Sequence, residues 1–417
     1  MYVGSTPTGS SIDKHLNLHS VFSYSEFEKA FNKLKKKNKY RQTSSNFDFK
    51  DRYEEKKNLN ALGKFLKEHS SNKTELYDGL ARYYPKPYKG IAIPKKNGDY
   101  RPLLVPSPLD RLVFLAALPR IYRIVSVRLL KFSALGVGIK GNSELKIPNI
   151  SYKILQEIRK GRKKYVLALD FQNFFSTINR NKLREKLKRV FSKSDEEELL
   201  ELLLVSLNNS IDSGKLFKSK FGHLNLDVNG IPQGLAYSPL LASFFATSLD
   251  ELIRKEKDVV SYRYLDDIVI IGSNRRKLVT IYSKIKKFSE PLGLKLHKLG
   301  EKTKIFSLIQ ENDSFEFLGI SFSKSGKRIT DKAIKKFLKK IKTEILIGKG
   351  LKTGPDNIKR IFNEYVTGWK QYYSTICPEH YKEVYPALAE EIRNHMLKKK
   401  VWERIYQSDK NLFDLKR

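Results

Sequence analysis

Two adjacent acids between two apolar runs constrain the fold of this chain more than any other feature. The segment from Tyr262 to Ile271 predicts a strand, a two-residue acidic turn at Asp266 and Asp267, and a second strand. Adjacent carboxylates repel each other, so this turn costs free energy that a bound divalent cation would remove. An Asp-Asp hairpin by itself is more often a solvent-facing turn than a metal site. The pair therefore gains its meaning from the other segments of the chain.

Two further segments belong with this hairpin. Tyr165–Leu169 is a short apolar run bounded by charge, which predicts a buried strand ending at Asp170. Residues 230–240, with Pro232-Gln233-Gly234 at their centre, form a loop that opens an apolar helix. Each segment alone has an ordinary explanation as a turn or a helix start. Their combination in this order is far less expected by accident. An acid on one strand facing an acid pair on a neighbouring hairpin would suit nucleotidyl transfer, which uses two Mg²⁺ ions about 3.5–4 Å apart on oxygen ligands.

The net charge indicates the class of partner. The chain has 417 residues, and its 81 basic and 45 acidic side chains give a formal net charge of +36, which favours nucleic acid. The single Cys377 excludes intramolecular disulfides and a zinc ribbon, and the seven histidines lack ligand-like spacing, so a metal must sit on oxygen ligands. The sequence shows neither a secretory signal nor an apolar run of the roughly 20 residues that span a membrane. We expect a cytoplasmic protein without a membrane partner.

Composition divides the chain into three parts. Residues 1–75 are polar and lysine-rich, with helical patterns at 24–34 and 58–66, and predict a helical N-terminal extension. In residues 76–325, the Asn97-Gly98 pair between apolar runs predicts a hairpin, and an acidic start near Ser194 predicts a buried helix through about Leu207. In residues 326–417, apolar side chains at helical spacing from Ile334 to Ile345 lie opposite lysines, glycines 348, 350 and 354 break the chain, and residues 357–373 predict another helix.

Together these motifs resemble the reverse transcriptase family, and the resemblance runs from about Tyr88 to Phe322. It implies an α+β right-hand polymerase, with fingers and palm in residues 76–325 and an α-helical thumb in 326–417. An antiparallel sheet of the palm would bear Asp170, Asp266 and Asp267 as catalytic metal ligands, with Asp266 expected as the direct ligand of the pair. The implied cofactors are two Mg²⁺ ions, for which Mn²⁺ could substitute.

The resemblance also implies roles for individual residues. Phe175, five residues after Asp170, matches the steric gate, whose ring crowds a 2′-hydroxyl and favours deoxynucleotides. Lys302 would protonate the leaving pyrophosphate, although plain surface charge explains it equally well. The nucleotide-binding set is Lys96, Arg101, Phe171, Phe175 and Gln233. The primer-grip turn is Phe317, Leu318 and Gly319.

Within the family the group II intron and retron-related branches are nearest, because Asn363-Glu364-Tyr365 and the aromatics through Tyr373 resemble an intron-type thumb. An aromatic stripe at this spacing is also typical of plain core. Tyr237, where many relatives of the family carry a small residue, would either alter the nucleotide pocket or fill space. The chain resembles the defence-associated, abortive-infection reverse transcriptases of bacteria. That resemblance implies an RNA template, with a dedicated noncoding RNA as one candidate, together with deoxynucleotides and a DNA product; the oligomeric state stays open.

Three alternatives compete with this interpretation. A viral-type RNA-dependent RNA polymerase shares the palm but typically has a second acid where this chain has Phe174 and Phe175. Template-independent or protein-primed DNA synthesis would use identical carboxylates. A catalytically inactive RNA-binding scaffold would have no reason to retain all three acids together with Phe175 and Gln233.

Overall fold

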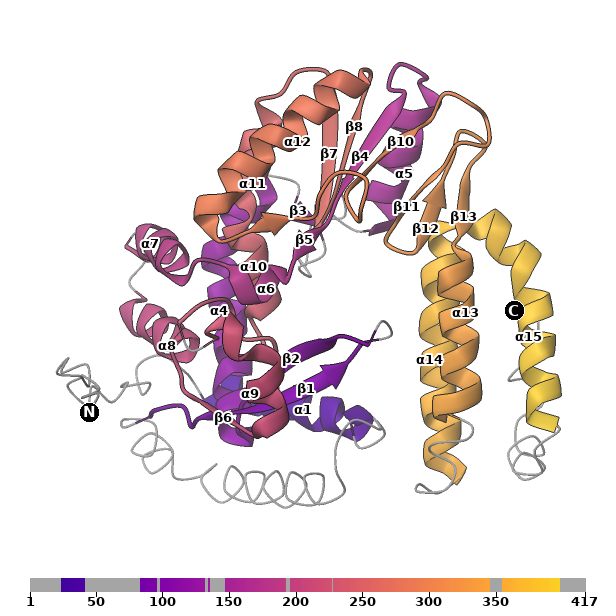
Figure 1. The fold of residues 1–417 in the computed structure, drawn as a ribbon. Helices are drawn as coiled ribbons and strands as arrows, with labels where there is room; N and C mark the ends of the chain where they lie inside the picture. Colours follow the sequence, from indigo (N-terminus) through magenta and orange to yellow (C-terminus); the bar gives the residue numbers. More distant parts are fainter. Residues whose placement is uncertain are drawn as a thin grey trace. The chain divides into compact units, whose positions relative to one another are not determined.

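The computed structural model describes residues 24–41, 83–95, 98–131, 134–135, 147–192, 196–226, 228–345 and 355–397 (Figure 1). The chain divides into two compact units. Among the described residues, the first unit contains 24–35, 83–124 and 180–238, and the second contains 36–41, 125–179 and 239–397. The α+β prediction is confirmed, since both units combine helices with sheets. Of the described helices, none is both long and apolar enough to cross a bilayer.

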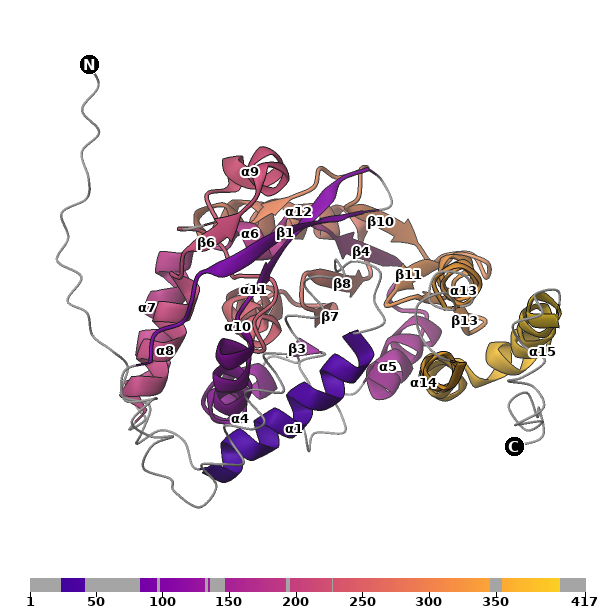
Figure 2. The ribbon, with the colours of Figure 1, turned by 90° about the horizontal axis from the view of Figure 1, so that it is seen from below.

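The first unit has a small three-stranded sheet (Figure 2). Strands β1 (Tyr88–Pro94) and β2 (Tyr100–Val105) form the predicted antiparallel hairpin, and β6 (Ile211–Ser213) pairs parallel with β1. The turn closes with the Lys95 N–H donating to the Asp99 carbonyl at 2.6 Å. Lys96 and Asn97 lie outside the described residues.

Helices surround this sheet, and the start of α4 shows how the sequence places them. The Asp110 N–H donates to Ser107 Oγ at 3.2 Å, and the Ser107 N–H donates to Asp110 Oδ2 at 3.3 Å. This reciprocal capping box, with Pro108 at the first helical position, fixes where the helix begins. The helices of the first unit, some of which run on into the second, are α1 (Tyr24–Arg41), α4 (Pro108–Lys131), α7 (Arg180–Phe191), α8 (Glu197–Leu207), α9 (Lys215–Phe221) and the short η2 (Gly222–Leu224).

Several helix predictions concern this unit. The pattern at 24–34 lies within α1, and α8 ends at Leu207 as predicted. The pattern at 58–66 and the predicted helix start at Ser194 lie outside the described residues. Tyr237 is fully buried against Phe114, with 5.3 Å between ring centroids, and its hydroxyl bonds to Ser206 Oγ. Because its side chain has no exposed surface, Tyr237 fills space in the core rather than lining a nucleotide pocket.

The second unit is built on a five-stranded sheet in the order β10-β4-β8-β7-β3. All neighbours are antiparallel except β3 and β7, which are parallel. Side chains alternate between the two faces of a sheet, and β4 and β8 are covered on both faces, so these two strands need apolar residues on both faces. That explains their nearly unbroken apolar sequences. The strands are β3 (Ala134–Leu135), β4 (Tyr165–Leu169), β7 (Val259–Tyr264), β8 (Asp267–Gly272) and β10 (Lys304–Ser307).

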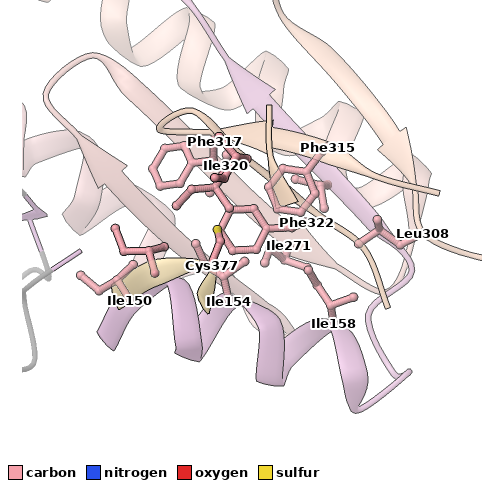
Figure 3. Packing of buried hydrophobic residues seen from close by; sticks show 14 of the residues in the cluster. Ile150, Ile154, Ile158, Ile271, Leu308, Phe315, Phe317, Ile320, Phe322 and Cys377 are labelled. Atoms are coloured by element: carbon pink, nitrogen blue, oxygen red, sulfur yellow. The ribbon is translucent and has the colours of Figure 1, made fainter. Parts of the chain in front are cut away.

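One face of this sheet carries the largest described core cluster. Val166, Val269 and Ile271 belong to it, together with residues of α5 (Ile147–Arg159), a three-stranded sheet and α14 (Pro355–Ile376). Figure 3 shows Ile271 in this cluster with Ile154 of α5 and with Phe322. The helix α12 (Arg275–Ser289) covers the other face, where Leu278 packs beside Gly272 (Figure 1). The three-stranded sheet contains β11 (Phe315–Phe317), β12 (Ile320–Phe322) and β13 (Lys327–Ile329). Shorter elements are β5 (Phe171–Gln172), α6 (Phe174–Thr177), α10 (Ser238–Phe245), α11 (Thr247–Arg254), η3 (Glu290–Leu292) and β9 (Lys295–Leu296).

The C-terminal part of the described chain is helical, as predicted. Thr330 caps α13 (Asp331–Lys339), which continues as η4 (Lys340–Ile345) and is followed by α14 (Pro355–Ile376) and α15 (Pro378–Leu397). The predicted apolar stripe is buried at Phe337 and Ile341, and the Phe337 ring stacks on Trp369 at 4.3 Å. Lys327–Ile329 still belong to a sheet, so the helices begin at Asp331, five residues past the start of the predicted thumb.

Candidate active site

The pairing of β4 with β8 determines where the three acids lie. The ladder ends with Leu169 opposite Ile268, and continuing its register by one residue sets Asp170, which follows β4, opposite Asp267, the first residue of β8. Directly opposed antiparallel residues have Cβ atoms about 4.5–5.5 Å apart on the same face of the sheet. Two carboxylates from segments almost 100 positions apart in sequence therefore become neighbours. Asp266, which immediately precedes Asp267, lies in the adjoining turn. The predicted grouping of these acids is supported by this register.

The turn between β7 and β8 differs from the sequence prediction by one residue. Asp267 already belongs to β8 and pairs with Tyr264, so the two turn residues are Leu265 and Asp266. Leu265 has φ 57°, in the left-handed region that costs an ordinary residue about 1–2 kcal/mol. Turn propensity favours Asp over Leu at such a position, which is why the sequence pointed to the wrong pair. Only one of the two acids is thus in the turn, and the other is fixed in the ladder.

Two residues beyond β9 contact the strand end that carries Asp170. The Asp170 N–H donates to Thr303 Oγ1 at 3.3 Å, and the His297 N–H donates to the Asp170 carbonyl at 3.0 Å. The His297 ring lies with Nε2 3.3 Å from Asp170 Oδ1 and Nδ1 3.7 Å from Glu301 Oε2. The side chain of Asp170 stays 42% exposed, so it remains accessible to a ligand.

The acids perturb one another electrostatically. Asp267 is exposed at the rim of the sheet, yet the surrounding protein removes part of its hydration. This desolvation, followed by repulsion from Asp266 and Asp170, raises the pKa of Asp267 to about 6, while the Lys332 ammonium acts in the opposite direction. The site therefore carries negative charge that nearby basic groups offset only in part, which is the condition that favours a cation.

The donor set fits a hard divalent cation. Asp170, Asp266 and Asp267 offer carboxylate oxygens only, and the single cysteine lies elsewhere, buried in the core. In the part of the chain that the structure describes, no three acidic, histidine or cysteine side chains already form a closed metal-binding cluster. Magnesium sites commonly use one or two protein carboxylates and take their other ligands from water and substrate phosphates. The three acids fit a metal of that kind.

The aromatic residues after Asp170 form a compact group. Asn173, with φ 48°, precedes the one-turn helix α6, which holds the Phe174 and Phe175 rings at 5.7 Å and close to perpendicular. Phe171 and Phe174 are buried, whereas Phe175 is half-buried. Of the aromatics that follow Asp170, Phe175 is therefore the one with accessible surface. Lys302 is exposed in the turn before Thr303, and its predicted role stays a prediction.

The predicted primer-grip turn is a tight hairpin between β11 and β12. Leu318 and Gly319 have φ 55° and 77°, the two positive values that a type I′ turn requires. Tyr372 on α14 donates its hydroxyl to the Leu318 carbonyl at 3.3 Å, and a Cβ on Gly319 would lie 2.9 Å from the Tyr373 hydroxyl. Phe317 is buried in the core cluster, whereas Leu318 and Gly319 are half-buried, so the two turn residues rather than this ring keep accessible surface.

The first unit holds the remaining predicted residues. Arg101 is exposed on β2, and three residues along that strand the Leu104 N–H donates to the Gln233 carbonyl at 2.8 Å. A Cβ on Gly234 would lie 1.9 Å from the Leu104 carbonyl oxygen, so only glycine allows this approach. The structure thus brings the strand of Arg101 next to the Gln233 loop.

Three residues at or near these sites escaped sequence analysis. His297 contacts Asp170, Arg263 lies under the acidic hairpin, and Arg180 donates to the carbonyls of the loop that precedes Gln233, including Asn229 at 2.7 Å. A lone histidine and two arginines in a chain this basic give no local signal. Only the packing of distant elements shows what they contact.

Comparisons with known proteins bear on the family of this chain. Residues 93–322 match the family described as Reverse transcriptase (RNA-dependent DNA polymerase). Protein YkfC of Escherichia coli (strain K12) is 26% identical over 283 residues, 59% of this chain and 68% of that protein. The putative COX1/OXI3 intron 1 protein of Saccharomyces cerevisiae is 24% identical over 242 residues, 57% of this chain but 26% of that protein. These relatives are consistent with the intron-related branch that the motifs predicted.

Among solved structures, apo telomerase from Candida tropicalis, truncated from its C-terminal domain, aligns with 14% identity and a TM-score of 0.44. The alignment covers 59% of this chain and 55% of that one. Telomerase from Candida albicans, in complex with a TWJ fragment of telomeric RNA, aligns with 13% identity and a TM-score of 0.43, over 79% of this chain and 64% of that one. The chain thus spans between half and two thirds of these neighbours.

The raised pKa of Asp267 predicts a pH-dependent stability. Folding raises this pKa from 3.8 to about 6, so in metal-free buffer the folded state binds more protons than the unfolded chain in that window, and the free energy of unfolding falls as the pH rises through it. Asp267→Asn cannot ionise, so its advantage over wild type in urea unfolding should grow from about pH 4 to about pH 6 and then level off. Glu311→Gln, an exposed acid in a loop, is the control. A difference that does not change with pH would contradict the prediction.

Proposed function

This chain belongs to the reverse transcriptase family, and we propose that it synthesises DNA on an RNA template by a two-metal mechanism. The observation that carries the proposal is the β4–β8 register, which sets Asp170 opposite Asp267 with Asp266 in the adjoining turn. Family membership supplies the activity class, RNA-dependent DNA polymerase. The donor chemistry favours Mg²⁺, a hard cation that prefers oxygen ligands, and Mn²⁺ could take its place.

The residues would divide the work as follows. Asp170, Asp266 and Asp267 would hold the metal ions, which when bound activate the 3′-hydroxyl and stabilise the leaving pyrophosphate. Phe175, the half-buried ring in the aromatic group that follows Asp170, would crowd a 2′-hydroxyl and so select deoxynucleotides. Lys302 would deliver a proton to the pyrophosphate.

Other residues would bind the substrates. The exposed Arg101 and Lys96 would contact the triphosphate, with Gln233 near the incoming nucleotide. The Leu318-Gly319 turn, held by the α14 tyrosines, would guide the primer end.

A finer proposal concerns the template and the biological role. We propose that the template is a dedicated noncoding RNA and that the enzyme acts in the bacterial cytoplasm in defence against phage. The net charge of +36 supports a large RNA partner, and the resemblance to abortive-infection reverse transcriptases supports the defence role. The Saccharomyces cerevisiae relative is named as an intron protein, and a structured RNA partner is compatible with that origin.

Template-independent or protein-primed DNA synthesis is the second candidate function. The same three acids would serve it, and what distinguishes it is whether product sequence follows a template. A catalytically inactive RNA-binding scaffold is disfavoured by the pair of opposed carboxylates, whose repulsion would be a cost without a benefit.

The main test is primer extension on defined RNA and DNA templates. Wild type should copy the RNA with deoxynucleotides, and Asp266→Asn/Asp267→Asn should fall below about one thousandth of that rate, because residues that act as a unit in catalysis fail together. Glu311→Gln should match wild type. Undiminished activity of the double variant would reject the assignment of the site, and a product unrelated to the template would favour the second candidate function.

Phe175 offers a test of nucleotide selection. Replacing it with Ala opens space beside the sugar, so the efficiency of ribonucleotide incorporation relative to deoxynucleotide should rise by about 10- to 100-fold. Phe288→Ala removes an exposed ring of the same type from α12 and should leave the ratio unchanged. Steady-state incorporation of matched nucleotide pairs gives the ratio. The same preference in the Phe175 variant would remove this ring from the gate role.

The partner RNA can be identified by sequencing the RNA that copurifies with the protein. A dedicated noncoding RNA should appear as one dominant species that persists when the salt is raised. Non-specific binding to the basic surface should weaken steeply with salt, by about 10³-fold or more between 50 and 200 mM for a protein with many phosphate contacts. A mixed population of RNAs, lost as the salt rises, would contradict the noncoding RNA proposal while leaving polymerase activity to the primer-extension test.

A further inference from the structure

A buried arginine side chain of β7 packs behind the acidic turn of the β7–β8 hairpin. Arg263, on β7, is only 2% exposed, and its partner Asp250, on α11, is 8% exposed. The pair is bidentate: Nε donates to Asp250 Oδ1 at 2.8 Å and Nη2 donates to Oδ2 at 2.6 Å. Such a fork-to-fork pair fixes the plane of the guanidinium as well as its position.

The remaining donors of Arg263 connect α10 to the hairpin turn. Nη2 donates to the Ser243 carbonyl at 3.1 Å, and Nη1 donates to Ser243 Oγ at 3.2 Å and to the Leu265 carbonyl at 3.1 Å. A guanidinium has five N–H donors, and these five bonds use all of them. The carbonyl of Leu265 is therefore tied to two helices through one rigid group.

The residue held in this way is the one under backbone strain. Leu265 has φ 57°, a conformation that persists only where its surroundings enforce it. It immediately precedes Asp266, so a change in its backbone would redirect Asp266 first and strain the start of β8 at Asp267. The Arg263 bond acts at the carbonyl of the strained residue itself.

Arg263 does not reach the acids directly. It is paired with Ile268, whereas its neighbour Tyr264 is paired with Asp267, and successive residues of a strand point to opposite faces. Asp170 and Asp267 therefore lie on one face of the sheet and Arg263 lies on the other. The hydrogen bonds of Arg263 therefore act on the acids only through the backbone of the hairpin.

We propose that Arg263 is a positioning residue that holds the Leu265 turn in its left-handed conformation and thereby presents Asp266 and Asp267 to the metal ions. The inference rests on the proposed function for its catalytic meaning, but the geometry it describes can be measured separately. The competing explanation is an ordinary structural ion pair, whose loss would matter only for stability.

A pair of substitutions separates these explanations. Arg263→Met alone would leave Asp250 buried without its partner and destabilise the fold, whatever the role of Arg263. Arg263→Met/Asp250→Leu removes both charges, and buried ion pairs replaced by apolar residues of similar volume often keep their stability. The double variant still lacks a donor for the Leu265 carbonyl. Lys284→Met/Glu256→Leu, which removes a partly exposed ion pair between α12 and the segment after α11, is the control for losing an ion pair elsewhere in this unit.

The full chain would be tested by three measurements: urea unfolding, Mn²⁺ affinity from metal-induced thermal shifts, and DNA synthesis on an RNA template. We expect Arg263→Met/Asp250→Leu to unfold like wild type, to bind Mn²⁺ at least about tenfold more weakly, and to lose about 100-fold in kcat with little change in the deoxynucleotide KM. Adding Leu265→Asn should restore about tenfold, since Asn tolerates the left-handed region. Wild-type Mn²⁺ affinity and kcat in a stable double variant would overturn the proposal.

Two further outcomes are decisive. If the double variant does not unfold cooperatively, Arg263→Lys, which keeps a charge beside Asp250 but lacks the fork that reaches Leu265, is measured in the same way and judged by the same results. If Mn²⁺ affinity and kcat fall only in proportion to the free energy of unfolding, and Leu265→Asn does not restore them, the Arg263–Asp250 pair has a purely structural role. If wild type makes no DNA but the variants still lose Mn²⁺ affinity, the proposed function fails and the positioning role stands.

Discussion

The antiparallel pairing of β4 with β8 is the interaction on which the rest of the second unit depends. It places Asp170 opposite Asp267, and because side chains alternate, it also sends Val166, Val269 and Ile271 to the core on that same face. A shift by one residue would move every one of these side chains to the other face. The buried apolar residues therefore enforce the register, and the register in turn assembles the acids. Core packing and site geometry are two results of one hydrogen-bond ladder.

The acids are held from several directions, which helps the fold to tolerate their mutual repulsion. Thr303 and His297 bond to the backbone at Asp170, and Arg263 bonds to the turn beside Asp266. These three hydrogen bonds act on backbone groups, so they fix the strand ends without using the carboxylates, and the His297 ring adds a contact to the carboxylate of Asp170. The raised pKa of Asp267 reflects the charge that remains. A site of this kind is rigid in its backbone and still electrostatically open to a cation.

Sequence reasoning succeeded where a local pattern has a local cause. The strand before Asp170, the hairpin of β1 and β2, the Leu318-Gly319 turn and the apolar stripe of α13 follow from periodicity, turn residues and known motifs. It failed by one residue at the acidic turn, because the ladder forces Leu265 into a conformation that propensity would not assign to it. It left Tyr237 undecided, since a buried ring and a pocket ring look the same in sequence.

The sequence by itself determined the class of protein, since three separated acidic and glycine-containing motifs in a fixed order identify a polymerase family without reference to coordinates. Only the tertiary structure decided which groups support the acids. Ser243, Asp250 and Arg263 are separated by 7 and 13 positions, and His297 is 127 positions from Asp170. Their contacts arise when helices and strands pack, and hydrogen bonds between distant segments leave no periodic trace along the chain. Local motifs therefore identify the residues that carry the chemistry, whereas the packing of the elements determines which residues hold them in place.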